Sequence, residues 1–266
     1  MKIARHFYVF SFVFLFGSSA TSFAQTPAPD GKSVGGAGVS VEKGIIPPAA
    51  SPTATATPKV SFFKDIVRDQ GRIWSSPVRF DKDDLKWAVP LAAATSLLIA
   101  TDRRTSSWVS RRGSLPGISH DVSLVGSVYG TGGAVAGFYL FGRATHNRHA
   151  QETGRLSAES LIDTAIITQV LKFATGRKRP DFGTGQGHFF DHGRSFPSGH
   201  SSSIWGLATV VAYEYKDHPL IKFGAFALAA AVSLSRYTGR NHYLSDVLIG
   251  SSLGYAIGRY VYVSHH

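Results

Sequence analysis

Six apolar stretches follow one another in the second part of the chain, and they limit the folds open to it. They lie near residues 87–100, 122–142, 159–173, 203–214, 222–235 and 245–263 and are rich in Ala and Leu. Their length and composition indicate helices rather than strands, and the segments between them hold the Gly, Pro and charged residues typical of loops. The sequence therefore predicts an all-α fold, a helical bundle of about six core helices.

The N-terminus has the layout of an export signal. Lys2 and Arg5 precede an apolar run from Phe7 to Phe16, and small residues follow up to Ala24. This pattern is typical of a cleavable secretory signal peptide, with cleavage after Ala24. An uncleaved membrane anchor is the alternative, although the run is shorter than the ~20 residues that span a bilayer. Either way the sequence predicts an exported protein, in the periplasm or on the periplasmic face of a membrane.

Residues 25–60 indicate a tether rather than a folded domain. Pro, Ala, Gly, Thr and Ser dominate them, and they hold too few large apolar groups to offset the entropy lost on ordering. The predicted organisation is a signal peptide over 1–24, a disordered tether over 25–60 and a helical domain over 61–266.

The apolar stretches leave two arrangements open with respect to a membrane. Several of them are shorter or more polar than the ~20 apolar residues that a spanning helix needs. The first is followed by basic residues that resemble a positive-inside signal, namely Arg103, Arg104, Arg111 and Arg112. Three crossings after a cleaved signal would place the loop after the third stretch in the cytosol. An exported site would lie on the opposite side. Helix length and this count of crossings therefore favour a bundle that does not fully span the membrane over one that does.

Charge and cysteine content narrow the chemistry. The 266-residue chain has a formal charge of +11, and loss of Lys2 and Arg5 with the signal peptide leaves +9 on the mature protein. This charge favours anionic partners such as phosphate esters and anionic lipid head groups. Nucleic acid ranks lowest, because no nucleic-acid-binding motif is present. The chain has no cysteine, which excludes disulfides, thiolate catalysis and a lipid anchor on an N-terminal cysteine.

The first of three polar clusters ends a predicted helix. It runs from Lys172 to Arg179 and Pro180. Lysine and arginine side chains bind phosphate oxygens well. A basic helix end is also common without any ligand, because last-turn cations offset the helix dipole.

The second cluster, Pro197-Ser198-Gly199-His200, precedes an apolar stretch. The free N–H groups at the start of a helix form an anion site, and His200 would stand beside the bound anion. The alternative interpretation is an ordinary Ser cap next to an exposed histidine.

The third cluster contains Ser235, Arg236, His242 and Asp246. If the chain is already helical at His242, the (i, i+4) spacing places Asp246 on the same face, where its carboxylate accepts the imidazole Nδ1–H. That hydrogen bond leaves Nε2 with a free lone pair for nucleophilic attack. A structural His–Asp pair is the alternative.

Together the three clusters resemble the signature of a known superfamily. Eleven specified residues occur in order as Lys-x6-Arg-Pro, Pro-Ser-Gly-His and Ser-Arg-x5-His-x3-Asp, a match that chance does not explain. The pattern is similar to that of the type 2 phosphatidic acid phosphatases, the bacterial class A acid phosphatases and the vanadium haloperoxidases. The resemblance implies a helical-bundle core, and residues 1–60 have no counterpart in it.

The resemblance also implies a role for each residue of the pattern. His242 would attack phosphorus, Asp246 would orient His242, and His200 would protonate the leaving alkoxide. The phosphoryl oxygens would be held by Lys172, Arg179, Ser198, Gly199 and Arg236. No metal or other cofactor is implied, because three cations already neutralise the phosphoryl group. Vanadate would bind only as an inhibitor, or as the cofactor of a haloperoxidase.

Several functions are open at this point. The first is a metal-independent phosphomonoesterase that forms a phosphohistidine and acts on lipid phosphates or diphosphates, such as phosphatidic acid or an isoprenoid diphosphate, at a membrane surface. A soluble periplasmic acid phosphatase that acts on small phosphate esters is the main alternative, because a signal and a tether precede the bundle. A vanadium haloperoxidase ranks below both, since those enzymes are generally larger. A binding protein with a dead site ranks last, because His200 and His242 are both present.

The loop between the first two clusters holds three further polar residues, His188, Asp191 and His192. We interpret them as the polar rim of a site rather than as metal ligands, because a third close ligand of matching type is missing.

A glycine at every fourth position follows the third cluster, at Gly250, Gly254 and Gly258. This spacing predicts a helix face that a neighbouring helix approaches closely, in support of the site.

Overall fold

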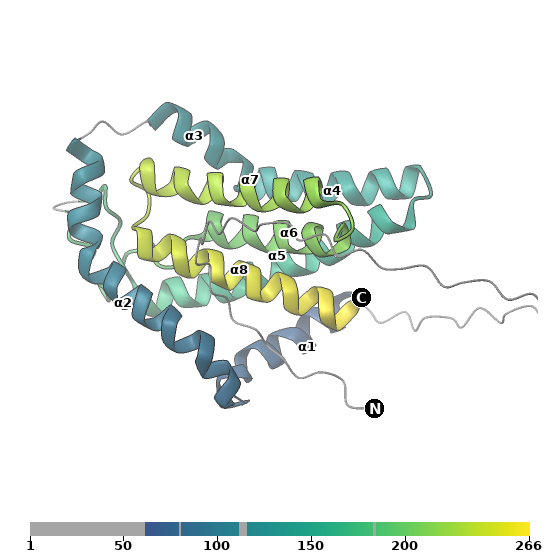
Figure 1. Ribbon diagram of the computed structural model, residues 1–266, viewed down its shortest axis with the longest axis horizontal. Coiled ribbons are helices and arrows are strands. Elements are labelled where there is room, and N and C mark those ends of the chain that lie inside the picture. Colours follow the sequence, from purple (N-terminus) through teal and green to yellow (C-terminus); the bar gives the residue numbers. More distant parts are fainter. Residues whose placement is uncertain (1–61, 80, 112–115, 183–184) are drawn as a thin grey trace, which may run out of the picture. The chain divides into compact units, whose positions relative to one another are not determined.

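The computed structural model of the protein describes residues 62–79, 81–111, 116–182 and 185–266. The predicted signal peptide and tether, residues 1–24 and 25–60, lie outside the described residues. The described part belongs to one compact unit and contains α-helices, one short 3₁₀ helix (η1) and no strand (Figure 1). The helices are α1 (Phe62–Trp74), η1 (Ser76–Arg79), α2 (Lys82–Arg111), α3 (Pro116–Val125), α4 (Val128–Ala144), α5 (Arg148–Thr175), α6 (Gly199–Glu214), α7 (Pro219–Thr238) and α8 (Leu244–His265). The predicted all-α class is confirmed.

Helix α6 lies at the centre of the bundle. It packs against α5, α7 and α8, while α4 runs beside α5 and α3 lies against α7. In Figure 1, α2 runs obliquely past these helices and contacts α8. Because α6 is covered on most sides, its sequence after the polar first turn is apolar on every face from Ile204 to Tyr213, apart from Thr209.

Two apolar clusters flank α6. One joins Ile204 and Ala208 of α6 to Ala229 and Val232 of α7, all of them buried. The other joins Val210 to residues of α5 and α8, namely Leu156, Ile167, Ile257 and Val261. The two clusters hold α5, α7 and α8 around one central helix, so the ends of these helices keep fixed positions relative to one another.

The structure differs from the sequence prediction around residues 122–142. That apolar stretch is not one helix, because α3 ends at Val125 and α4 begins at Val128. Ser127 interrupts it with an extended backbone, and its side chain accepts a hydrogen bond from the Gly130 N–H at 3.2 Å. This is the geometry of an N-cap, so a polar residue inside an apolar stretch starts a new helix. The prediction also missed α1 and η1, which precede the first apolar stretch.

The close approach predicted from the glycine spacing is confirmed. A Cβ atom at Gly250 would lie 2.5 Å from the Ser198 carbonyl oxygen, and one at Gly258 would lie 2.6 Å from the Gly206 carbonyl oxygen. At Gly254 it would overlap the Ser202 carbonyl oxygen. The backbones of α8 and α6 are therefore in direct contact, and this contact places the start of α8 beside the start of α6.

Two described segments are long and apolar enough to cross a membrane, judged by length and composition: Ser119–Ala144, which covers most of α3 and all of α4, and Pro219–Thr238, which is α7. Only 11% and 28% of their most apolar windows are buried inside the bundle. Both segments thus present apolar surface outward. The sequence-based preference for a bundle that does not fully span stays a prediction.

The contact between α6 and α8 gives a stability prediction. Replacing Gly254 by Ala forces the two backbones apart, and we expect the free energy of unfolding to fall by about 1–3 kcal/mol. The control is Gly137→Ala in α4, where a Cβ atom meets nothing within 4 Å. Alanine loses less conformational freedom on folding than glycine, so this variant should gain about 0.5–1 kcal/mol in unfolding free energy. Denaturant unfolding of both variants measures the difference. Equal stability of the two variants would contradict the close packing.

Candidate active site

The end of α5 turns the first polar cluster toward the interior. Helix α5 ends at Thr175, and Gly176 follows with a φ of 52°, a left-handed conformation that glycine adopts without strain. Its N–H donates to the Lys172 carbonyl at 3.0 Å. The chain then folds back on itself, because the Ser195 N–H donates to the Arg177 carbonyl at 2.8 Å. The predicted helix end at the first cluster is confirmed.

The start of α6 has the predicted Ser cap. The Ser198 hydroxyl accepts from the Ser201 N–H at 3.5 Å and from the Ser201 hydroxyl at 3.0 Å. Gly199 is the first helical residue, and the Lys172 Cε lies 3.7 Å from the position of a Cβ there. The first N–H groups of a helix have no partner within that helix and attract anions. Lys172 therefore adds its charge to a helix start that already favours an anion.

His242 does not lie on a helix, so the geometric premise of the sequence interpretation was wrong. Helix α8 begins only at Leu244, with Tyr243 as its N-cap. The two side chains still meet, and the His242 Nδ1 lies 3.5 Å from an Asp246 carboxylate oxygen. They meet because Asp246 is the third residue of α8 and its carboxylate reaches back to accept the Tyr243 N–H at 2.9 Å. The turn that holds His242 is fixed in addition by a 3.1 Å bond from its N–H to the Arg236 carbonyl.

Sequence reasoning missed the groups that hold Asp246. The Arg177 guanidinium donates to one Asp246 oxygen at 2.6 Å and to Asp102 of α2 at 2.8 Å. The Ser195 hydroxyl donates to the other Asp246 oxygen at 2.5 Å. Arg177, Asp102 and Asp246 are each at most 2% exposed. One guanidinium thus pairs with two buried carboxylates and joins α2 to the start of α8.

Two aromatic rings cover the Arg177 guanidinium. Its Cζ lies 4.2 Å from the centre of the Tyr243 ring and 4.7 Å from that of Phe189. Rings at this distance attract a cation and keep water from it. In the sequence, Arg177 stands in the run Arg-Lys-Arg beside Arg179, and nothing there distinguishes the buried arginine from its exposed neighbours.

The pKa of His242 and that of Asp246 both favour a neutral imidazole facing a carboxylate. Burial lowers the pKa of His242 to about 4, an effect that outweighs the hydrogen bond with Asp246. Burial alone would raise the pKa of Asp246, but its hydrogen bonds and the charge of Arg177 bring it below its usual value. At neutral pH the imidazole is therefore uncharged. Since Nδ1 faces the carboxylate, Nε2 is the nitrogen with a free lone pair.

The other residues of the pattern form a cationic cluster beside this pair. Burial, together with the charge of Arg236, lowers the pKa of His200 to about 4. Burial and the charge of Arg179 lower the pKa of Lys172 to about 8. Lys172 also influences His242 electrostatically. The structure therefore brings together the cations and histidines that the sequence singled out.

Arg236 and Arg179 differ in their surroundings. Arg236 is 8% exposed, and its Nε is buried without a hydrogen-bond partner among the described residues. Arg179 is exposed. A buried donor without a partner is costly, so the Arg236 guanidinium has capacity for an anion.

The structure does not bring His188, Asp191 and His192, in the loop between α5 and α6, together at metal-binding spacing, and their role as the polar rim of the site stays a prediction. His188 is exposed and lies 3.0 Å from the Gln186 side chain, while Asp191 pairs with Lys178 at 2.6 Å. Among the described residues, the one group spaced for metal binding is Asp65, Glu159 and His265. This group lies at the opposite end of α8 from His242, roughly 30 Å away at 1.5 Å per residue.

Comparison with known proteins agrees with the geometry. Residues 155–266, which hold all of the residues singled out by the motifs, match the family model described as the PAP2 superfamily. The matched segment, 112 of the 266 residues, is similar to that superfamily. The resemblance inferred from the three clusters is confirmed, and the helical bundle is a PAP2-like fold.

Individual PAP2 relatives cover different parts of the chain. A PA-phosphatase related-family protein of Dictyostelium discoideum is 35% identical over 144 residues, 47% of this chain and 52% of that protein. The lipid A 1-phosphatase of Porphyromonas gingivalis is 26% identical over 190 residues, 68% of this chain and 38% of that protein. The chain thus spans about half, or less, of the length of these curated relatives.

One solved structure shares the fold. It is the crystal structure of a transmembrane PAP2 type phosphatidylglycerolphosphate phosphatase from Bacillus subtilis, with a TM-score of 0.51 and 23% identity. The match covers 65% of this chain and 92% of that one. The helical bundle here therefore shares the fold of that protein over most of that protein's length.

The buried and exposed arginines of the first cluster give a matched prediction. Arg177→Met leaves the Asp102 and Asp246 carboxylates buried without their cation, and we expect a loss of about 3–5 kcal/mol in unfolding free energy. Arg179→Met changes an exposed side chain and should alter that free energy by no more than about 0.5 kcal/mol. Denaturant unfolding, or the yield of folded protein where Arg177→Met is too unstable to purify, measures both. Similar stability of the two variants would contradict the assigned role of Arg177.

Proposed function

We propose that the protein is a phosphomonoesterase that hydrolyses lipid phosphates or diphosphates through a phosphohistidine on His242. The observation that carries the proposal is the 3.5 Å contact between His242 Nδ1 and the Asp246 carboxylate, close to the start of α6, where Lys172 lies against Gly199. The names of two relatives, a lipid A 1-phosphatase and a phosphatidylglycerolphosphate phosphatase, support a phosphorylated lipid as substrate. The predicted export would place the reaction at the periplasmic face of a membrane.

Substrate binding relies on charge and on free hydrogen-bond donors. Lys172 and Arg236, together with Arg179 from the loop, neutralise the phosphoryl oxygens as charge redistributes in the transition state. The Ser198 hydroxyl and the Gly199 N–H, at the start of α6, donate to the same oxygens. These groups supply the positive charge that a metal ion supplies in other phosphatases, so the proposal includes no cofactor.

The first chemical step transfers the phosphoryl group to the enzyme. The Nε2 lone pair of His242 attacks phosphorus, the bond from phosphorus to the ester oxygen breaks, and the alkoxide leaves with a proton from His200. Burial and nearby cations lower the pKa of His200 to about 4, because they disfavour its charged form. A bound phosphate offsets those cations and raises the pKa of His200, so the substrate itself favours the protonated acid.

The second step returns the enzyme to its starting state. His200, now neutral, accepts a proton from a water molecule that attacks phosphorus. The bond from phosphorus to Nε2 breaks and inorganic phosphate leaves. In the phosphohistidine the imidazole carries a positive charge, and the Asp246 carboxylate stabilises that charge. Asp246 can do so because its lowered pKa keeps it ionised.

Removal of each histidine should have a different effect on turnover. His242→Ala removes the nucleophile and should abolish phosphate release from every ester. His200→Ala removes the acid of the first step and the base of the second. In the first turnover it should slow release of the alcohol from an alkyl phosphate by about 10²–10⁴-fold but slow release of p-nitrophenolate far less, because nitrophenolate leaves without a proton. First-turnover release of the two leaving groups measures this difference. Residual activity of His242→Ala equal to the wild-type activity would overturn the proposal.

The pH dependence follows from the same two residues. Turnover needs His242 neutral and His200 protonated, so we expect an optimum on the acid side of neutrality and a rate that falls as pH rises through the pKa of His200 in the complex. In His200→Ala the alkaline fall should disappear from the residual first-turnover release of alcohol from an alkyl phosphate. A pH–rate profile of both proteins measures it. Persistence of the same fall in His200→Ala would assign it to another group.

A further inference from the structure

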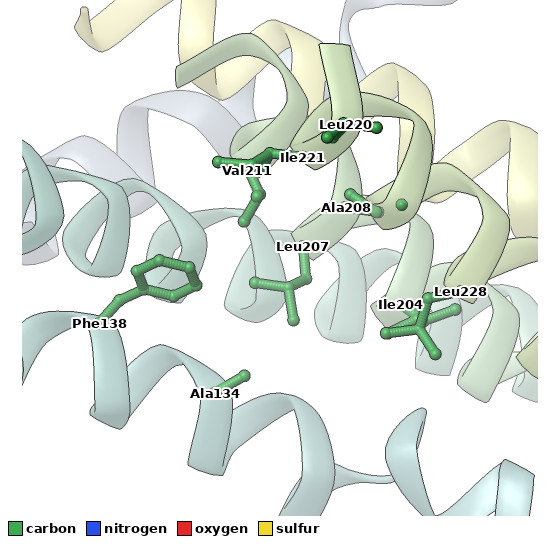
Figure 2. Close-up of a pocket in the computed structure, with 11 residues that line it drawn as sticks. Ala134, Phe138, Ile204, Leu207, Ala208, Val211, Leu220, Ile221 and Leu228 are labelled. Atoms are coloured by element: carbon green, nitrogen blue, oxygen red, sulfur yellow. The ribbon is translucent and has the colours of Figure 1, made fainter. Parts of the chain in front are cut away.

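Helix α1 buries acidic side chains where the other helices bury apolar ones. Elsewhere in the bundle hydrocarbon contacts join the helices; Phe138 of α4, for example, packs against the apolar cluster that contains Leu207 of α6 (Figure 2). The buried residues of α1 are Asp65, Ile66 and Asp69, so two of the three are carboxylates. One buried isoleucine contributes little to holding a 13-residue helix. The docking of α1 therefore depends on what balances its two acids.

The acids of α1 lie close to a third carboxylate and a histidine. Glu159 of α5 is fully buried, and His265 is the last residue of α8. One oxygen each of Asp65 and Glu159 and one ring nitrogen of His265 all lie within 4.8 Å of one another. Atoms at this spacing, carried by three different helices, can close around a single divalent ion with small side-chain movements.

The histidine of this group is oriented as metal-bound histidines are. A carboxylate only accepts hydrogen bonds, so the 2.6 Å contact between His265 Nε2 and Asp69 assigns the ring hydrogen to Nε2. Nδ1 then carries the lone pair, 3.8 Å from Asp65 Oδ1. The Tyr260 hydroxyl donates to the other Asp69 oxygen at 2.8 Å and holds that carboxylate in place. A carboxylate behind the ring is the usual support of a histidine that binds a metal.

The Glu159 carboxylate has capacity for a cation. Its Oε1 is buried with no hydrogen-bond partner among the described residues, although His265 Nε2 lies 3.3 Å away. The one hydrogen on Nε2 is directed to Asp69, at the shorter distance, so Oε1 receives none. Burial raises the pKa of Glu159 to about 7, despite the nearby charges of His265 and Arg155. A buried carboxylate oxygen without a donor is costly, and a bound cation would remove that cost.

A positive group already lies between two of the three candidate ligands. Arg68 Nη2 is 2.5 Å from Asp65 Oδ1 and 3.3 Å from His265 Nδ1. The Arg68 side chain is 40% exposed, so it can turn out into water. The surroundings of these two atoms thus favour a cation, and a divalent ion would supply more charge there than one guanidinium does.

We propose that Asp65, Glu159 and His265 bind one divalent transition-metal ion that fastens α1 to α5 and α8. Two carboxylates and one imidazole suit Zn²⁺ or Mn²⁺ better than Mg²⁺, which prefers oxygen ligands alone. The ion displaces the Arg68 guanidinium from the space that it occupies. Because the site lies roughly 30 Å from His242, the ion stabilises the packing of α1 and takes no part in phosphoryl transfer.

Equilibrium dialysis of the purified full chain, without a histidine tag, against Zn²⁺ or Mn²⁺ measures binding, and metal analysis gives the stoichiometry. We expect one ion per chain. Glu159→Gln, which keeps the shape of the side chain, and His265→Ala should each weaken binding at least about 100-fold. Arg68→Met removes the competing cation and should tighten binding about two- to fivefold.

The matched control is Glu214→Gln. Glu214 is also a buried carboxylate beside histidines, 2.9 Å from His149 and 3.2 Å from His266, but within the described part of the chain these three are not at metal-binding spacing. This variant should bind the ion as the wild type does. Hydrogen exchange gives a second readout, because the ion should slow exchange of the α1 amides in the wild type and in Glu214→Gln but not in Glu159→Gln.

Several outcomes would overturn this site. A wild-type chain that binds neither ion would show that Arg68 and His265 alone balance the carboxylates. Equal affinity of the wild type, Glu159→Gln and His265→Ala would place any bound ion elsewhere, as would loss of binding in Glu214→Gln. Weaker binding in Arg68→Met would overturn the displacement of the guanidinium. None of these results bears on the proposed hydrolysis, which phosphate release tests separately.

Discussion

The buried carboxylate of Asp246 is the group on which the rest of the site depends. It accepts hydrogen bonds from Arg177, from Ser195 and from the backbone of Tyr243, and it faces Nδ1 of His242. A buried charge is costly unless it is paired and hydrogen-bonded, and here each partner comes from a different part of the chain. Burial of the ionised Asp246, which keeps the imidazole oriented, therefore requires this end of the bundle to be assembled.

Helix ends, rather than helix faces, position the chemical groups. The carbonyl of Asp246 accepts the Ser198 N–H at 2.9 Å, which joins the first turn of α8 to the cap of α6. The glycine contacts between the two helices extend from that point along their length. Asp102 adds α2 to the same assembly through Arg177. A tightly packed bundle thus holds free N–H groups, cations and two histidines at one end, and this fixed arrangement suits a reaction that depends on preorganised charge.

Local patterns in the sequence predicted much of this structure. The apolar stretches predicted the all-α class. The predicted Ser198 cap is present at the start of α6, and the predicted glycine face of α8 contacts α6. Both could be predicted because caps and glycine-lined helix faces are written in residues close together in the sequence. Three features escaped prediction because they depend on distant residues or on a single polar side chain. Arg177 pairs with Asp102 and Asp246, which are 75 and 69 residues away. Ser127 breaks an apolar stretch by capping α4. His242 meets Asp246 through the start of a helix, although the spacing had suggested a helix face.

The central claim is that the phosphoryl group passes through Nε2 of His242. Rapid acid-free quenching of the wild-type protein with a radiolabelled phosphate ester, followed by proteolysis at alkaline pH and mass mapping of the labelled peptide, tests it most directly. The account predicts one acid-labile, alkali-stable phosphoryl group, formed before phosphate is released and located on His242. Label on any other residue, or turnover at full rate with no labelled protein at any time, would contradict it.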